Sequence, residues 1–186
     1  MKKLLNCLCL IFLILANFSF SSICRGDLQE HKVYRVARVI DGDTIKLENG
    51  EHVRLIGIDA PELKDNAKLQ RDLKERHLTK SAEIAMGRRS YQFTKHLIEG
   101  KKVHLEFDKD KYDEYHRVLA YVYLTSGIFV NAQIVSEGYA YAYTVKPDLQ
   151  YAQLFRKLYK EAREEHRGLW QEEKSRRKHF KWFNNT

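Results

Sequence analysis

Residues 32–58 read KVYRVARVIDGDTIKLENGEHVRLIGI, and this stretch decides the fold. Two turn signals, Asp41-Gly42 and Asn49-Gly50, divide it into three runs that are rich in β-branched residues. Asparagine and glycine both accept positive φ angles, so Asn49-Gly50 favours a tight hairpin. The stretch therefore predicts three consecutive strands, at residues 32–40, 43–48 and 51–58.

The rest of the chain combines two further strands with helices. Alternating apolar residues predict strands at 102–107 and 118–124. Helical spacing of apolar residues predicts helices at 81–99, 131–137 and 149–166, with Asn131 as the cap of the second. Residues 63–80 are charged and show no apolar face, so we expect a mobile loop or a frayed helix there. Five short strands with an inserted helix are compatible with a small closed barrel, of which the oligonucleotide-binding (OB) barrel is one example.

The N-terminus differs in composition from the rest of the 186-residue chain. Lys2 and Lys3 precede an apolar run from Leu4 to Phe20, and small residues follow. This pattern is typical of a secretory signal peptide, so residues 1–25 are predicted to direct export to the periplasm or the medium. Two alternatives stay open: an uncleaved membrane anchor, and a lipid on Cys24. Since Cys24 is the only cysteine beyond the apolar run, no disulfide is expected inside the mature domain.

The composition beyond this segment favours one basic domain. The chain is long enough for a single domain with a core, which we place at residues 30–172. A formal net charge of +8 fits a polyanionic partner such as nucleic acid, although a solvated basic surface explains it as well. Residues 173–186 form a basic tail, which either adds affinity for nucleic acid through counterion release or is a disordered end.

Carboxylates and arginines recur at spaced positions in this basic chain. They are Asp41, Asp43, Arg54, Asp59, Glu62 and Arg117. Carboxylates bind hard divalent cations through oxygen, and arginines clamp phosphate with paired donors. A site with both suits metal-assisted attack on a phosphodiester. The structural alternative is that the aspartates satisfy turn amides and the arginines are surface charges; for Asp41, we expect the turn role.

The same motifs, in the same order, resemble the staphylococcal nuclease (thermonuclease) family. The resemblance spans about residues 33–170, and its motifs are Ile40–Thr44, Arg54–Glu62, Asp113–Tyr123, Ser136–Ala140 and Gly168–Trp170. It implies an α+β fold: a five-stranded OB-fold barrel with three α-helices. It also implies a calcium-dependent endonuclease that cleaves DNA and RNA and leaves 3′-phosphate ends. We further expect a monomer that prefers single strands, which suit aromatic stacking.

The resemblance further implies a role for each site residue. Asp43 and Asp59 would bind Ca²⁺ through their carboxylates, and Ala60 through its backbone carbonyl. Glu62 would be the general base that orients a water molecule and accepts its proton. Arg54 and Arg117 would stabilise the charge that develops on the phosphoryl oxygens.

Three further residues are predicted to bind the substrate: Tyr115, Tyr143 and Lys146, the tyrosines by stacking near a base. The chain departs from the family pattern at Glu114 and His116, where relatives often have lysine and glycine, and in a longer segment at residues 64–87. One alternative function stays open: a nucleic-acid-binding module of the same fold without catalysis.

Overall fold

The computed structural model describes residues 32–76, 78–144 and 150–171. The predicted signal peptide, Lys146 and the basic tail at 173–186 therefore lie outside the described residues. The chain from Lys32 onward forms one unit, and everything below concerns that unit. None of its described helices has the length and apolar character needed to span a bilayer.

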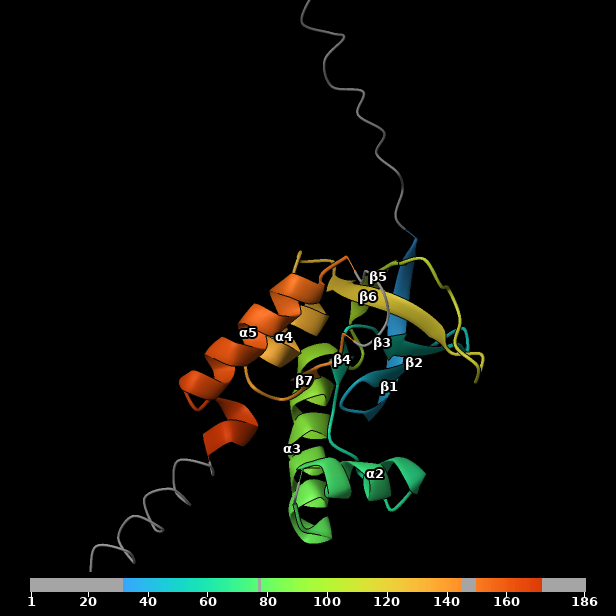
Figure 1. Ribbon diagram of the computed structural model, residues 1–186. Helices are drawn as coiled ribbons and strands as arrows, with labels where there is room; N and C mark the ends of the chain where they lie inside the picture. The colour runs from blue at the N-terminus through green and yellow to red at the C-terminus, as the bar shows by residue number, and fades with distance from the viewer. Residues whose placement is uncertain (1–31, 77, 145–149, 172–186) are drawn as a thin grey trace, which may run out of the picture. The chain divides into compact units, whose positions relative to one another are not determined.

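Five strands close into a barrel in the order β1-β2-β3-β6-β5 (Figure 1). Their bounds are β1 Val33–Asp41, β2 Thr44–Leu47, β3 His52–Leu55, β5 Lys102–Glu106 and β6 Val118–Leu124. The long strand β1 pairs with β5 through its first residues and with β2 through its last, which closes the barrel. Only β3 and β6 pair in parallel among these neighbours. The five-stranded barrel of an α+β OB fold is thereby confirmed.

The third predicted strand is wrong in extent, because residues 51–58 contain a break. β3 ends at Leu55, and β4 (Ile58–Asp59) leaves the barrel to pair with β7 (Tyr141–Ala142). Gly57 lies at the break with a φ of 80°, and a Cβ there would lie 2.2 Å from the ring of Phe155. Both the backbone angle and the close approach require glycine. The break carries Asp59 out of the barrel wall.

Four α-helices occur within the described residues, one more than predicted. Their bounds are α2 Ala67–Arg76, α3 Lys80–Ile98, α4 Val130–Ser136 and α5 Ala152–Glu164, and a 3₁₀ turn, η1, covers Gly168–Trp170. The three predicted helices correspond to α3, α4 and α5 with ends shifted by one to three residues. Asn131 does not cap α4, because it lies inside the helix.

The additional helix, α2, occupies most of the segment for which we expected a loop or a frayed helix. Leu69 is its fully buried apolar anchor. Asn66 accepts a hydrogen bond from the Leu69 amide at 2.8 Å, the contact of a helix N-cap. The sequence shows no apolar stripe because, beside Leu69, the inward face of α2 carries charged residues spaced by four, Lys68, Asp72 and Arg76.

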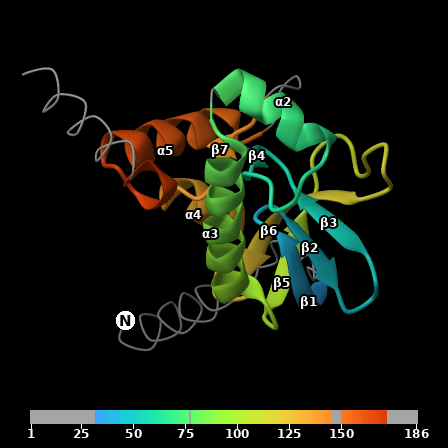
Figure 2. The same ribbon diagram turned by 90° about the horizontal axis from the view of Figure 1, so that it is seen from below.

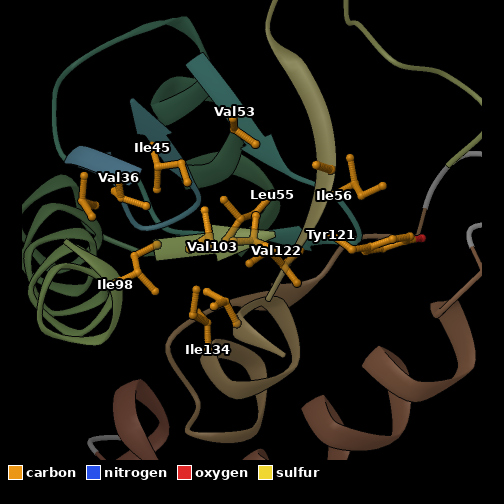
Figure 3. Packing of buried hydrophobic residues seen from close by; sticks show 14 of the residues in the cluster. Val36, Ile45, Val53, Leu55, Ile56, Ile98, Val103, Tyr121, Val122 and Ile134 are labelled. Carbon is orange, nitrogen blue, oxygen red and sulfur yellow. The ribbon is translucent and has the colours of Figure 1, made fainter. Parts of the chain in front are cut away.

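The hydrophobic core fills the barrel and continues beneath α4 and α5 (Figure 3). Val36, Ile45 and Leu55 from the strands and Ile134 from α4 are fully buried. Asn131 is also fully buried, and it accepts a hydrogen bond from the Val122 amide and donates one to the Ile56 carbonyl, both at 2.9 Å. A polar side chain with satisfied partners thus fixes α4 against the barrel.

Candidate functional site

The turn between β1 and β2 positions Asp43. The Asp41 carboxylate accepts a hydrogen bond from the Asp43 amide at 3.1 Å and shapes the turn. Oδ2 of Asp43 accepts a hydrogen bond from the Ala60 amide at 2.7 Å, which joins the turn to the residue after β4. Burial raises the pKa of Asp43 to about 8, against the opposing effect of Arg54. A further positive charge beside Asp43 would therefore favour its ionised form.

Arg54 on β3 lies between two aspartates. Its Nη1 is 3.0 Å from Oδ2 of Asp43, and its Nη2 is 3.2 Å from Oδ1 of Asp59. The Arg54 side chain is only 15% exposed, so it is not a surface charge of the strand. The planar guanidinium fixes the separation of the two carboxylates.

Glu62 follows β4 and is held by contacts from two helices. Gly87 of α3 packs against its backbone so closely that a Cβ would lie 2.2 Å from the Glu62 carbonyl oxygen. Oε2 of Glu62 accepts a hydrogen bond from Asn66 at 2.6 Å, and Oε1 pairs with Lys68 at 2.7 Å. The side chain remains 18% exposed, which leaves it accessible to solvent.

Helix α2 lies beside the start of α3 (Figure 2). Its side chains also contact β4 and β7, and they bring two cations to these carboxylates. Four oxygen atoms surround the Nζ of Lys68. They belong to Glu62 at 2.7 Å, Asp72 at 3.1 Å, Asp59 at 3.2 Å and the Ala60 carbonyl at 3.3 Å. Burial opposes the ammonium, yet Asp59 and Glu62 hold the pKa of Lys68 above its ordinary value. Lys68 is therefore charged at neutral pH.

The second cation, Arg76, contacts the other oxygen of Asp59. Its Nη2 is 2.9 Å from Oδ2 of Asp59, and its Nη1 is 2.6 Å from the buried carboxylate of Glu83. The guanidinium also lies 3.8 Å from the ring centre of Tyr141 on β7. Asp59 is thus paired with cations from β3 and from α2 at once. We call Asp43, Asp59, Glu62, Asp72 and the Ala60 carbonyl the acidic site.

Arg117 lies just before β6, the strand that pairs with β3. Its Nε is 2.7 Å from Asp113, and its guanidinium faces the ring of Tyr115 at 5.6 Å. The ion pairs and hydrogen bonds within the described residues do not join Arg117 to the acidic site. Arg117 therefore lies just before the strand next to the one that carries Arg54. Its phosphate-binding role stays a prediction.

The predicted substrate-binding residues are exposed where the structure describes them. Tyr115 is 71% exposed and Tyr143 is 51% exposed. The Tyr143 amide donates to the Gly57 carbonyl at 3.0 Å, which places the backbone of Tyr143 near the start of β4. Lys146 lies outside the described residues.

The sequence matches known proteins over most of this unit. Residues 52–172 match the family described as Staphylococcal nuclease homologue. The chain belongs to the staphylococcal nuclease family. It is 34% identical to the thermonuclease of Staphylococcus hyicus over 143 residues, which are 75% of this chain and 76% of that protein. It is 36% identical to the thermonuclease of Staphylococcus intermedius over 74% of this chain and 76% of that protein. It is also 36% identical to endonuclease YncB of Bacillus subtilis (strain 168), over 72% of this chain and 59% of that protein.

The calcium ion that the staphylococcal nuclease family implies has a chemically suitable donor set in this chain. Calcium prefers carboxylate and carbonyl oxygen atoms, and only such atoms surround the Lys68 ammonium. However, no three His, Cys, Asp or Glu side chains within residues 32–76, 78–144 and 150–171 are close enough to form a metal-binding group. The cations Arg54, Lys68 and Arg76 separate the carboxylates instead.

Compared with the pattern that the staphylococcal nuclease family predicts, the structure adds residues from α2. The structure brings Asp43, Arg54, Asp59, Ala60 and Glu62 together around one place, and their predicted roles stay predictions. The sequence pattern places Arg117 in this group as well and does not include Lys68, Asp72 and Arg76. One signal could have revealed them: cation, anion and cation recur at intervals of four, which places all three on one helix face. From the sequence alone, the high charge of these residues favours an irregular segment instead.

Proposed function

We propose that this protein is a calcium-dependent endonuclease that hydrolyses phosphodiester bonds of DNA and RNA and leaves 3′-phosphate ends. One observation carries the proposal: Arg54 joins Asp43 and Asp59 within 3.2 Å, with Glu62 bridged to the same cluster by Lys68. Membership of the staphylococcal nuclease family supports it, since similar proteins are named thermonuclease and endonuclease.

We assign two catalytic roles to residues of this chain, a general base and a group that stabilises negative charge. Glu62, partly exposed and attached to a rigid backbone segment, orients a water molecule and accepts its proton during attack on phosphorus. Arg54 presents fixed donors to the phosphoryl oxygens as their charge grows. Asp43, Asp59 and the Ala60 carbonyl would hold calcium, which supplies positive charge that stabilises the transition state.

Three narrower statements belong to the same proposal. The protein is exported through the predicted signal peptide at residues 1–25, it acts as a monomer, and it prefers single strands. Exposed Tyr115 and Tyr143 support the last statement, since aromatic rings stack on unpaired bases.

A second candidate is a nucleic-acid-binding module without catalysis. One observation favours it: Lys68 and Arg76 already neutralise the carboxylates that would hold the ion. Such a module would retain nucleic acid with a steep salt dependence and would never cleave it.

Digestion of single-stranded DNA with calcium or with a chelator tests the first candidate. We expect cleavage with calcium and none with the chelator. Glu62→Gln should lower the cleavage rate by about 10²-fold or more, because the amide cannot accept the proton. Glu75→Gln, on the exposed side of α2, is the matched control and should keep full activity. Equal cleavage in chelator would contradict the calcium requirement, and salt-sensitive binding without cleavage would favour the second candidate.

A further inference from the structure

The Lys68 ammonium lies where the predicted calcium ligands and the predicted base converge. It contacts Asp59, the Ala60 carbonyl and Glu62, and the shortest of these distances is 2.7 Å, to Glu62. An ammonium and a divalent cation both seek several oxygen atoms, so they compete for the same place.

We propose that Lys68 is a built-in competitor of the divalent cation, delivered to the acidic site by α2, and that cation binding displaces Lys68 and loosens this helix. The inference rests on the proposed function, because it concerns regulation of the same site. It assigns to α2 the role of a closing element that holds the acidic site in a latent state until the cation concentration is high enough.

The structure provides an alternative partner for the displaced ammonium. Asp72 lies one helical turn after Lys68 and is 3.1 Å from its Nζ. A lysine side chain can swing on its flexible stem while keeping an i,i+4 pair. Lys68 can therefore release Asp59 and Glu62 without losing every partner, which keeps the cost of opening the site low.

The same contacts explain why α2 would respond as a unit. Arg76 holds the second oxygen of Asp59 from the last turn of α2, as Lys68 holds the first from its first turn. The buried apolar contact of the helix is Leu69, so most of its attachment to the rest of the protein is electrostatic. A divalent ion on Asp59 weakens both attachments, because it neutralises the carboxylate that they share.

Calcium titration by isothermal calorimetry tests the proposal directly. Lys68→Met should bind calcium at least about tenfold more tightly than the wild type does. A tenfold change in affinity corresponds to a difference in binding free energy of only about 1.4 kcal/mol. Lys74→Met removes the same charge from the exposed side of α2 and should change the affinity by no more than about threefold, because its charge is screened by solvent. Equal affinities in the two variants would overturn the proposal.

A second measurement needs no variant and so does not depend on how Lys68→Met folds. Hydrogen exchange of the wild-type protein should show that the amides of residues 67–76 lose protection when calcium is added. Unchanged or increased protection of α2 would overturn the displacement of the helix.

The two proposals can fail separately. Calcium-dependent cleavage by the wild type, together with equal calcium affinity of Lys68→Met and Lys74→Met, would remove only the role of Lys68. Absence of both calcium binding and cleavage in the wild type and in Lys68→Met would overturn the proposed function and this inference together.

Discussion

At the scale of single residues, the shape of the Arg54 side chain matters as well as its charge, because it contacts two carboxylates at once. Its two terminal nitrogens reach different aspartates, Asp43 and Asp59, and its Nη1 also donates to the Leu55 carbonyl at 2.9 Å. A lysine would supply the same charge as a point, without the planar fork. One of the two buried carboxylates would then lose its partner on β3.

Arg54→Lys should therefore destabilise the fold although it conserves charge. We expect a loss of about 1–3 kcal/mol in the free energy of unfolding, the usual cost of a buried polar group without its partner. Urea denaturation measures this loss. Arg35→Lys is the matched control on β1, since the Arg35 side chain is 49% exposed and its change should cost less than about 1 kcal/mol. Equal losses at both positions would contradict the importance of the fork.

At the scale of elements, α2 shows how a helix can be stable without an apolar stripe. Its first turn is fixed by Asn66, whose Oδ1 accepts from the Leu69 amide and whose Nδ2 donates to Glu62. Its inward face is held by ion pairs of Lys68 and Arg76. The helix end and the predicted base are thus coupled through one residue, Asn66.

Asn66→Ala should loosen α2 by about 1 kcal/mol, the typical cost of losing an N-cap. Hydrogen exchange of residues 67–76 in the absence of calcium would report it as faster exchange. Asn66→Asp separates the two roles of the side chain, since the carboxylate still caps the helix but cannot donate to Glu62; it should keep the protection of α2. Unchanged exchange in Asn66→Ala would show that the cap does not hold the helix.

At the scale of the whole described unit, aromatic contacts and one carboxylate join the barrel to the C-terminal helices. The fully buried Tyr121 of β6 lies edge-on to Tyr151, with ring centres 4.7 Å apart. Asp108 accepts a hydrogen bond from the Tyr121 hydroxyl at 2.7 Å and one from the Gln150 amide at 3.1 Å. Burial would raise the pKa of Asp108, but these hydrogen bonds hold it below its ordinary value.

The contribution of Asp108 to stability should depend on pH. Because its pKa is lower in the folded state, its contribution is present above about pH 4 and is lost as the pH falls through the folded pKa. Asp108→Asn should therefore reduce the free energy of unfolding by about 1 kcal/mol at pH 7 and by less in acid. Denaturation at several pH values measures the difference, with the exposed Asp110→Asn as control. A difference that grows in acid would contradict this reading.

The barrel was predictable because its signals are local. Asn49-Gly50 specifies a hairpin within two residues, and the alternation in residues 102–106 and 118–124 needs no distant partner. The break at Gly57 was not predictable in this way, because its cause is the ring of Phe155, almost a hundred residues later in the chain. Only the folded packing brings the two together.

The sequence by itself determined five strands compatible with a closed barrel, the resemblance to the family that implies the OB fold, and the candidate residues Asp43, Arg54, Asp59 and Glu62. These follow from short turns, from local alternation and from motifs in a fixed order. The tertiary structure alone decided that α2 forms, that Lys68 and Arg76 neutralise the acidic site, and that Arg117 pairs with Asp113. The physical reason is that an ion pair depends on distance in space, whereas a sequence pattern records only the order and type of the charges.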